Sequence, residues 1–485
     1  MELSLSRVST RSLALAAAAT AAALLVAPAN LIGQAPARLS PAVTFTKDIA
    51  PILQRSCQNC HRPGSVAPMS LISYEEVRPW AKSIRHRTAL GSKPDAMPPW
   101  YIEKNIGIQK FKEDTSLSAD EVRKIAAWVE AGAPRGDAAN MPAPVKFAGA
   151  SEWQLGQPDL IVSSPTVAMP AQSPDWWGDV GQSATGLSED RYVQSVEIKE
   201  VTEAAEQPAS GDTTGTRRTV GGQAIIHHLA YGLFDKDGKP FSDGGAIWPV
   251  HEVGRNPDVF DPEVGKLLPA GSKIGFFSAH LHANGRATKA HVNIGFRFFP
   301  KGYKPTKKFV DVHVSTGWID LEGNKANQKT EGFTVLQENM KIMIFEPHLH
   351  AAGVRQCVDA IWGNHTAETL VCAGYNHGWI RVYNFEDDAQ PLLPKGTILR
   401  MTSYFDTTAA NKNIPDPRNW SGLGNRSIDN MSTTVVTGIP LTDEQFEQEM
   451  DKRRTRLQLR AGQTVIGCPL CGIVKKPQTT ARLGQ

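Results

Sequence analysis

The sequence predicts a multidomain protein in which a small all-α domain precedes two tandem all-β domains. Ser118 and Glu121 have the spacing of a helix capping box, and apolar residues at helical spacing follow them. Beyond residue 155, residues 192–201 and 292–298 alternate between apolar and polar side chains at period two, as half-buried strands do. Helix signals therefore dominate the first part of the chain, and strand signals dominate the rest.

The predicted domain boundaries follow changes in composition. Residues 139–154 are rich in Gly, Ala, Asn and Pro and form a predicted linker. Residues 267–274 resemble residues 392–399, which favours two β domains of similar build that meet near residue 303. The predicted division is a signal peptide (1–37), the helical domain (43–138), the linker (139–154), the first β domain (155–303), the second β domain (304–470) and a tail (471–485).

The first residues have the features of a secretory signal peptide. Arg7 and Arg11 precede an apolar run at residues 13–26, and Ala27 and Ala29 supply a small-x-small cleavage pattern. The alternative is an uncleaved membrane anchor, but the run is short for a bilayer span, which needs about 20 residues. We therefore expect a periplasmic or secreted protein with no integral membrane segment after processing. The net charge of +3 gives no reason to expect a nucleic-acid partner.

The six cysteines fall into three local pairs, and an oxidising compartment would allow them to form disulfides. Cys357 and Cys372 bracket a predicted hairpin and are expected to be bonded to each other. For Cys468 and Cys471 a disulfide, a metal site and a redox pair remain open, with the disulfide preferred. The remaining pair belongs to a motif with its own chemistry.

Residues 57–61 have the sequence Cys-Gln-Asn-Cys-His, which is the attachment signature of c-type haem. The thiols of Cys57 and Cys60 add to the haem vinyl groups, and His61 then reaches the iron as proximal ligand. The alternative is a redox dithiol or zinc pair followed by an unrelated histidine. The export signal and the flanking helices favour one covalent haem c. Residues 43–138 resemble the small cytochrome c domains that are fused to bacterial secreted enzymes.

The sixth iron ligand is expected to come from elsewhere in this helical segment. Met97 is the preferred residue, because it lies in a Pro-rich loop between the two predicted helices. A thioether ligand raises the haem potential, which suits an electron carrier. Met69 and His86 are the alternatives.

Histidines of the β-rich part are grouped in three pairs: His227 and His228, His280 and His282, and His348 and His350. Neutral imidazole is a ligand for copper, iron, nickel and zinc. Residues two apart on a strand share a face, so His348 and His350 can converge on one metal. The adjacent His227 and His228 point to opposite faces of a regular strand, and they can share an ion only at a bulge or a strand end.

Four motifs carry a resemblance to a known family: residues 225–234, 278–285, 347–353 and 427–431. In this order they resemble the copper type II, ascorbate-dependent monooxygenases, which include the peptidylglycine hydroxylating and dopamine β-hydroxylating enzymes. The resemblance covers about residues 155–440. It implies two tandem jelly-roll β-sandwich domains and two coppers.

The resemblance also implies a set of ligands for each copper. The ligands implied for the electron-transfer copper are His227, His228 and His280, with His282 as the alternative third ligand. The ligands implied for the oxygen-binding copper, where hydroxylation takes place, are His348, His350 and Met431. The family's substrate-binding residues find no match, and His313, His365 and His377 have no assigned role.

These patterns together predict an exported, haem c-fused copper monooxygenase that hydroxylates a C–H bond of a small molecule or peptide with O2. Electrons would pass through the haem to two uncoupled coppers from an ascorbate-like reductant or a redox protein. The alternative is a periplasmic haem–copper electron-transfer or copper-binding protein without hydroxylase activity. A third interpretation is a β-barrel oxygenase with a single metal in one histidine group.

Overall fold

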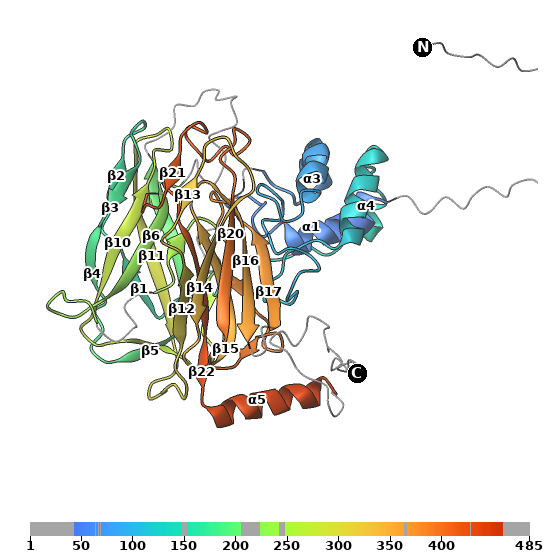
Figure 1. The fold of residues 1–485 in the computed structure, drawn as a ribbon. Helices are drawn as coiled ribbons and strands as arrows, with labels where there is room; N and C mark the ends of the chain where they lie inside the picture. Colours follow the sequence, from blue (N-terminus) through green and yellow to red (C-terminus); the bar gives the residue numbers. More distant parts are fainter. Residues whose placement is uncertain are drawn as a thin grey trace, which may run out of the picture. The chain divides into compact units, whose positions relative to one another are not determined.

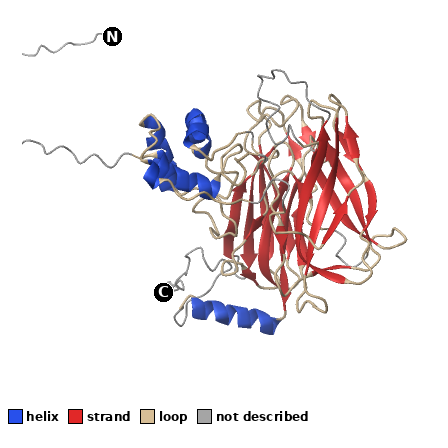
Figure 2. Ribbon diagram, turned by 180° about the vertical axis from the view of Figure 1, so that it is seen from behind, coloured by secondary structure: helices blue, strands red, loops and turns tan. Residues whose placement is uncertain are grey.

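The computed structural model describes residues 43–458, except residues 64, 66, 68, 148–152, 205–223, 242–247, 363–365 and 427. The predicted signal peptide, the predicted tail, His365, Cys468 and Cys471 lie outside the described residues. Strands make up most of the regular structure (Figure 2). In the described part of the chain, no helix has the length and apolar character needed to cross a membrane.

Most of the described helices belong to the first part of the chain (Figure 1). The helical elements are η1 (Phe45–Ile49), α1 (Ala50–Ser56), α2 (Tyr74–Val77), η2 (Arg78–Trp80), α3 (Ala81–Thr88), α4 (Ala119–Glu130), η3 (Ala138–Asn140) and, near the end, α5 (Asp443–Arg456). The predicted capping box is confirmed, because the Ser118 hydroxyl accepts a hydrogen bond from the backbone N–H of Glu121 at the start of α4. Ile125 and Trp128 on α4 pack with Phe45 and Leu53 in a small core of this segment.

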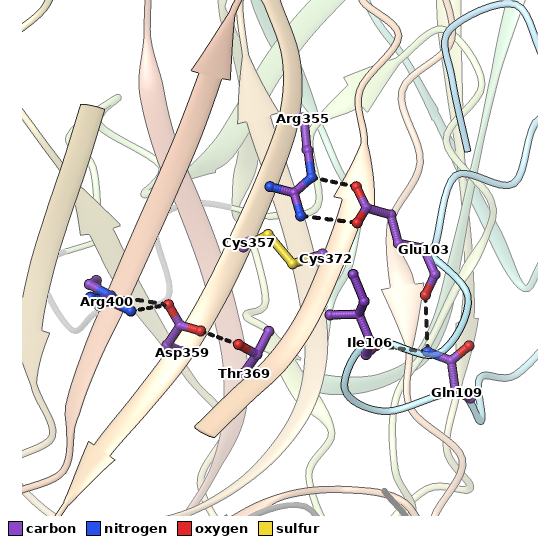
Figure 3. Close-up of a disulfide and its surroundings, with 9 residues drawn as sticks. All are labelled: Glu103, Ile106, Gln109, Arg355, Cys357, Asp359, Thr369, Cys372 and Arg400. Atoms are coloured by element: carbon purple, nitrogen blue, oxygen red, sulfur yellow. Dashed lines mark hydrogen bonds and ion pairs between the residues drawn. A yellow bond between two sulfur atoms is a disulfide. The ribbon is translucent and has the colours of Figure 1, made fainter. Parts of the chain in front are cut away.

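The loop between α3 and α4 packs into a different core. Trp100, Ile108 and Phe111 are buried with strands of the second half of the chain. The Glu103 backbone N–H donates to the Cys372 carbonyl at 2.9 Å, and the Glu103 carboxylate pairs with Arg355 (Figure 3). This loop is therefore held by the β-rich part, although it lies between two helices in sequence.

The first β region, residues 155–303, contains two sheets. Their strands are β1 (Leu160–Ser163), β2 (Val167–Met169), β3 (Trp176–Gly178), β4 (Gly181–Ala184), β5 (Arg191–Ala204), β6 (Ile226–Phe234), β7 (His251–Glu252), β8 (Asp258–Val259), β9 (Lys266–Leu268), β10 (Lys273–Leu281) and β11 (Thr288–Phe298). One sheet has the order β1-β11-β5-β8, with β2 on β11 and β9 on β5, and the other has the order β3-β10-β6-β7, with β4 on β10. Val292, Ile294 and Phe296 from β11 meet Leu229 and Phe276 of the other sheet in one core.

The second β region begins at residue 304 and has the same general build. Its strands are β12 (Val310–Ser315), β13 (Asp320–Leu321), β14 (Gln328–Val335), β15 (Asn339–Leu349), β16 (Gly353–Trp362), β17 (Thr366–Gly374), β18 (Tyr383–Asn384), β19 (Leu392–Leu393), β20 (Ile398–Phe405), β21 (Ser421–Gly422) and β22 (Ser432–Leu441). The main sheets are β12-β22-β15-β18, with β19 on β15, and β14-β20-β16-β17. Ile342 and Phe345 pack against Val358 and Leu399 across the two sheets. The chain is thus mostly β, with two regions that are consistent with β-sandwich domains.

The sequence echo corresponds to equivalent local structures. In each region a short strand, β9 or β19, is followed by a turn with a left-handed glycine, Gly271 or Gly396, at φ values of 67° and 84°. The next strand, β10 or β20, then lies in the opposite sheet. Glycine adopts this backbone conformation without a Cβ penalty, which explains why the echo keeps it.

The predicted Cys357–Cys372 disulfide is confirmed. The two residues are register partners on β16 and β17, and their sulfur atoms are bonded (Figure 3). The Cα atoms lie 4.1 Å apart. A disulfide is compatible with an oxidising compartment outside the cytoplasm.

Candidate metal centre and haem site

The paired histidines lie at strand ends. His227 and His228 begin β6, whereas His280 and His282 lie at the end of β10. Because β6 and β10 are antiparallel, the start of one meets the end of the other, and His280 is the register partner of His228. The fold therefore brings together two histidine pairs that are about 50 residues apart in sequence.

A bulge reshapes β10 at this point. The register shifts between Phe277 and His280, and Ser278 has a positive φ of 50°. The Ser278 carbonyl accepts a hydrogen bond from His228 Nδ1 at 2.9 Å. Adjacent His227 and His228 thus lie at a strand end opposite a bulge, but their rings have different neighbours: His227 lies near His280 and His282, whereas His228 lies near His348.

A first histidine group consists of His227, His280 and His282. Their ring centres are 5.1, 6.0 and 6.1 Å apart. Because a metal–nitrogen bond is about 2 Å long, two imidazoles on one metal have ring centres no more than about 6.5 Å apart. The spacing of the first histidine group fits one ion, and it includes both candidates for the third ligand.

The residues around His280 hold its ring in place. Its Nε2 donates to the Asp175 carboxylate at 2.9 Å, and the ring stacks on Trp177 with centres 5.0 Å apart and planes at 4°. Metal-ligating histidines commonly donate their other ring N–H to a carboxylate or a carbonyl, which orients the ring. In a neutral His280 this hydrogen bond makes Nδ1 the nitrogen with the lone pair.

A second histidine group consists of His228, His348 and His350. His348 lies 5.6 Å from His350 and 6.0 Å from His228, measured between ring centres. His348 Nδ1 donates to the buried Glu252 carboxylate at 3.2 Å. The β15–β22 register ends at the pair Leu349 and Ser432, so Met431 lies one residue beyond it, beside His350. The fold thus brings Met431 to the strand end that carries the second pair.

Burial keeps most of these imidazoles neutral. It lowers the pKa of His227 to about 3 and that of His350 to about 3, with neighbouring histidines adding to the effect. His348 differs, because the hydrogen bond and charge of Glu252 outweigh burial and raise its pKa. The same contact outweighs burial at Glu252 and lowers the pKa of that carboxyl. Neutral imidazoles have the lone pairs that metal binding requires.

His377 is a seventh histidine of the cluster. It follows β17, and its ring centre lies 4.6 Å from that of His227 and 6.5 Å from that of His350. Its carbonyl accepts a hydrogen bond from His227 Nε2 at 2.9 Å. Sequence reasoning left it without a role because it stands alone, with no second histidine at ligand spacing.

The rings are neighbours, but their ligand atoms do not converge. Within the described residues, no group of three or more His, Cys, Asp or Glu side chains has a geometry that could hold a metal ion. The spacing of the ring centres fits copper or another imidazole-binding metal, and so do the hydrogen bonds that the ring N–H groups donate to carbonyls and carboxylates. Binding would require the rings to turn toward a common point.

A cavity of about 380 Å³ is lined mostly by residues of the segment between β20 and β22. Ala352, Arg426, Asp429 and Asn430 contribute to its wall, together with Trp420, whose side chain is 65% exposed. Arg426 and Asp429 lie close enough to His350 to raise its pKa against the larger effect of burial. Arg426 and Asp429 form an ion pair at 2.7 Å. The cavity wall therefore includes two residues that influence the pKa of His350.

The haem motif forms one compact turn at the end of α1. The His61 N–H donates to the Cys57 carbonyl at 2.9 Å, and the Cys60 N–H does so at 3.1 Å. His61 Nδ1 donates to the Met69 carbonyl at 3.2 Å, which makes Nε2 the nitrogen that can bind iron. Cys57 and Cys60 are not bonded to each other, and burial raises the pKa of the Cys57 thiol to about 12.

The three candidates for the sixth ligand differ in environment. The Met97 side chain is 41% exposed, and His86 is exposed on α3. Met69 is half-buried and packs against the same small core as Cys57. Met97 stays a prediction, and Met69 is the candidate that packs nearest to the motif.

Comparisons with known proteins leave the family open. No family model and no curated protein matches the chain. Among solved structures, the major capsid protein P2 of Bacteriophage PM2 is 8% identical, with 58% of this chain and 96% of that chain covered and a TM-score of 0.25. Infectious bursal disease virus Gx strain gives 8% identity, 59% and 73% coverage and a TM-score of 0.18. The N-terminal CBM22-1-CBM22-2 tandem domain of Paenibacillus barcinonensis Xyn10C is 10% identical, with 60% of this chain and 99% of that chain covered and a TM-score of 0.16. Scores this low carry no argument about fold or function.

Proposed function

We propose that the chain is an exported copper monooxygenase in which a haem c-bearing, all-α cytochrome c domain precedes two jelly-roll β-sandwich domains. One observation carries the proposal. Each of four clustered histidines donates one ring N–H to a carbonyl or carboxylate: His227, His228, His280 and His348. This is the outer-contact pattern of metal-ligating imidazoles, and in His227, His228 and His348 it leaves the second ring nitrogen for a ligand bond.

Bound copper would supply dioxygen activation. One oxygen atom would enter a C–H bond, and two electrons and two protons would reduce the other to water. The side chains prepare for this in distinct ways. Asp175 orients His280, whereas Glu252 orients His348 and stabilises its N–H. Met431 lies one residue beyond the strand end that carries His348 and His350, and its thioether, as a ligand of that copper, would favour Cu(I).

The haem segment would serve as the entry point for electrons. His61 has its Nδ1 engaged by the Met69 carbonyl, so the ring is oriented for iron ligation through Nε2. The donor would be an ascorbate-like reductant or a redox protein. The substrate, a small molecule or a peptide, would occupy the cavity whose wall includes Arg426 and Asp429, which influence the pKa of His350.

The test is a metal count with spectra, followed by oxygen uptake. The full-length exported protein should contain one iron as haem c and two coppers. It should consume O2 when a reductant and a substrate are both present. His348→Ala should abolish that uptake, whereas His313→Ala, at an exposed position on β12, should leave it unchanged. Copper-loaded wild type that never consumes O2 with any reductant would overturn the hydroxylase proposal.

A haem–copper electron carrier without hydroxylation is the second candidate. It is favoured by the continuous row of neighbouring histidines, since His228 of one region lies 6.0 Å from His348 of the other. Met431→Ala separates the two candidates. It should stop oxygen consumption in a hydroxylase while haem-to-copper electron transfer continues, but it should have no oxygen phenotype in a carrier.

A further inference from the structure

His377 has no role in the ligand sets described above, although it lies among their members. Its Nδ1 is shielded from solvent and has no hydrogen-bond partner. His227 Nδ1 and His350 Nδ1 are likewise shielded from solvent and have no hydrogen-bond partner. Buried polar atoms are normally satisfied, so three such nitrogens in one cluster need a common explanation.

The ring spacing supplies one. His377 and His227 have ring centres 4.6 Å apart, well within the limit of about 6.5 Å for two imidazoles on one metal. His350 lies at that limit, at 6.5 Å from His377. The hydrogen bond from His227 Nε2 to the His377 carbonyl also makes Nδ1 of His227 the lone-pair nitrogen.

The position of His377 matters as much as its distance. His227 belongs to β6 of the first β region, whereas His350 follows β15 of the second. His377, in the segment after β17, has a ring neighbour in each of the two histidine groups, His227 in the first and His350 in the second. A metal on His377 would therefore tie together groups that the sequence assigns to separate coppers.

We propose that His377 is a further copper ligand, on the same ion as His227, and that it links the first histidine group to the second. The inference rests on the proposed function in one respect, namely that the cluster binds copper. The bound ion would be copper rather than a hard cation, because the available donor atoms are imidazole nitrogens.

The experiment compares His377→Phe and His377→Gln with the control His313→Phe in the full-length protein. Copper affinity is measured by competition with a chromogenic Cu(I) chelator, and copper is also followed by the shift in Tm on binding and by the Cu(II) EPR spectrum. Both His377 variants should bind one copper at least about 10-fold more weakly, with a smaller copper-induced rise in Tm and altered nitrogen hyperfine lines. The control should match wild type.

The outcomes separate this inference from the function. Wild type that binds copper, with His377 variants of equal affinity and identical EPR, would overturn the inference alone and leave His377 as a structural residue. Wild type that binds no copper would overturn both. X-ray absorption of wild type gives the number of imidazoles per copper without any variant, so a folding defect in His377→Phe cannot hide the answer. A count of three or fewer at every copper rules out the added ligand.

Discussion

The haem motif and the histidine cluster bring their candidate metal-binding residues together in opposite ways. Cys57, Cys60 and His61 lie within five residues and are held by hydrogen bonds inside one turn. The cluster depends on contacts between residues 96, 105 and 150 positions apart in sequence. A local site needs only its own turn, whereas the cluster forms only when both β regions are folded and packed. The two sites should therefore respond differently to the same kind of change.

The largest expected effect breaks the local site. Cys57→Ser combined with Cys60→Ser removes both thiols, so covalent haem should be lost completely, as measured by intact mass and haem absorbance. Copper binding by the cluster should persist, because its predicted ligands lie in the β-rich part of the chain and not at the end of α1. Loss of both metals from folded protein would show that the sites are not independent.

The next effect concerns the second histidine group. His348→Ala removes a predicted ligand and leaves the Glu252 carboxylate buried without its partner. Substrate-dependent oxygen uptake should fall by at least about 100-fold, and the free energy of unfolding by about 3 kcal/mol. Oxygen electrode and urea titration measure the two effects. The matched His313→Ala should change neither, and haem content should be normal in both variants.

The metal-free cluster should also be sensitive to acid. In the unfolded chain His227 and His350 bind protons near pH 6.5, whereas burial lowers their folded pKa to about 3. Stability is therefore complete above the unfolded pKa and is lost as the pH falls from about 6.5 toward 3, by up to about 1.4 kcal/mol per pH unit for each histidine.

Urea unfolding at pH 7 and pH 5 tests this expectation, with haem absorbance followed as the local control. His350→Gln should make the loss of stability with acid shallower. The Glu252–His348 pair behaves differently at the alkaline end. Because the pKa of His348 is raised in the folded protein, the pair contributes stability below about pH 6.5. That stability is lost as the pH rises through the raised pKa of His348. A free energy of unfolding that does not change between pH 7 and pH 5 would contradict the burial of neutral imidazoles.

The smallest effect is expected at the cavity. Trp420→Ala removes an exposed aromatic side chain from the cavity wall and should raise KM by about 3- to 10-fold with little change in kcat, because uniform binding is lost. Trp318→Ala is the matched control, since Trp318 is 83% exposed and does not line the cavity. Equal effects of the two variants would indicate that the cavity is not the substrate site.

Much of the secondary structure was predictable because its signals are local. The Ser118 capping box and the period-two pattern of β11 depend on neighbours within a few residues, and both were confirmed. Cys357 and Cys372 were recognisable because they belong to one hairpin. The echo around Gly271 and Gly396 was visible for the same reason, as each glycine serves its own turn.

The sequence by itself determined the haem attachment motif, the change from helix to strand near residue 155 and the histidine pairs, since each is encoded at short spacing. The tertiary structure decided which of these pairs meet. It put His228 beside His348, gave Asp175 and Glu252 their histidine partners, and brought a lone His377 into the cluster. Such contacts depend on how two sheets pack and on a bulge in β10, and residues far apart in sequence carry no mark of the neighbours that packing will give them.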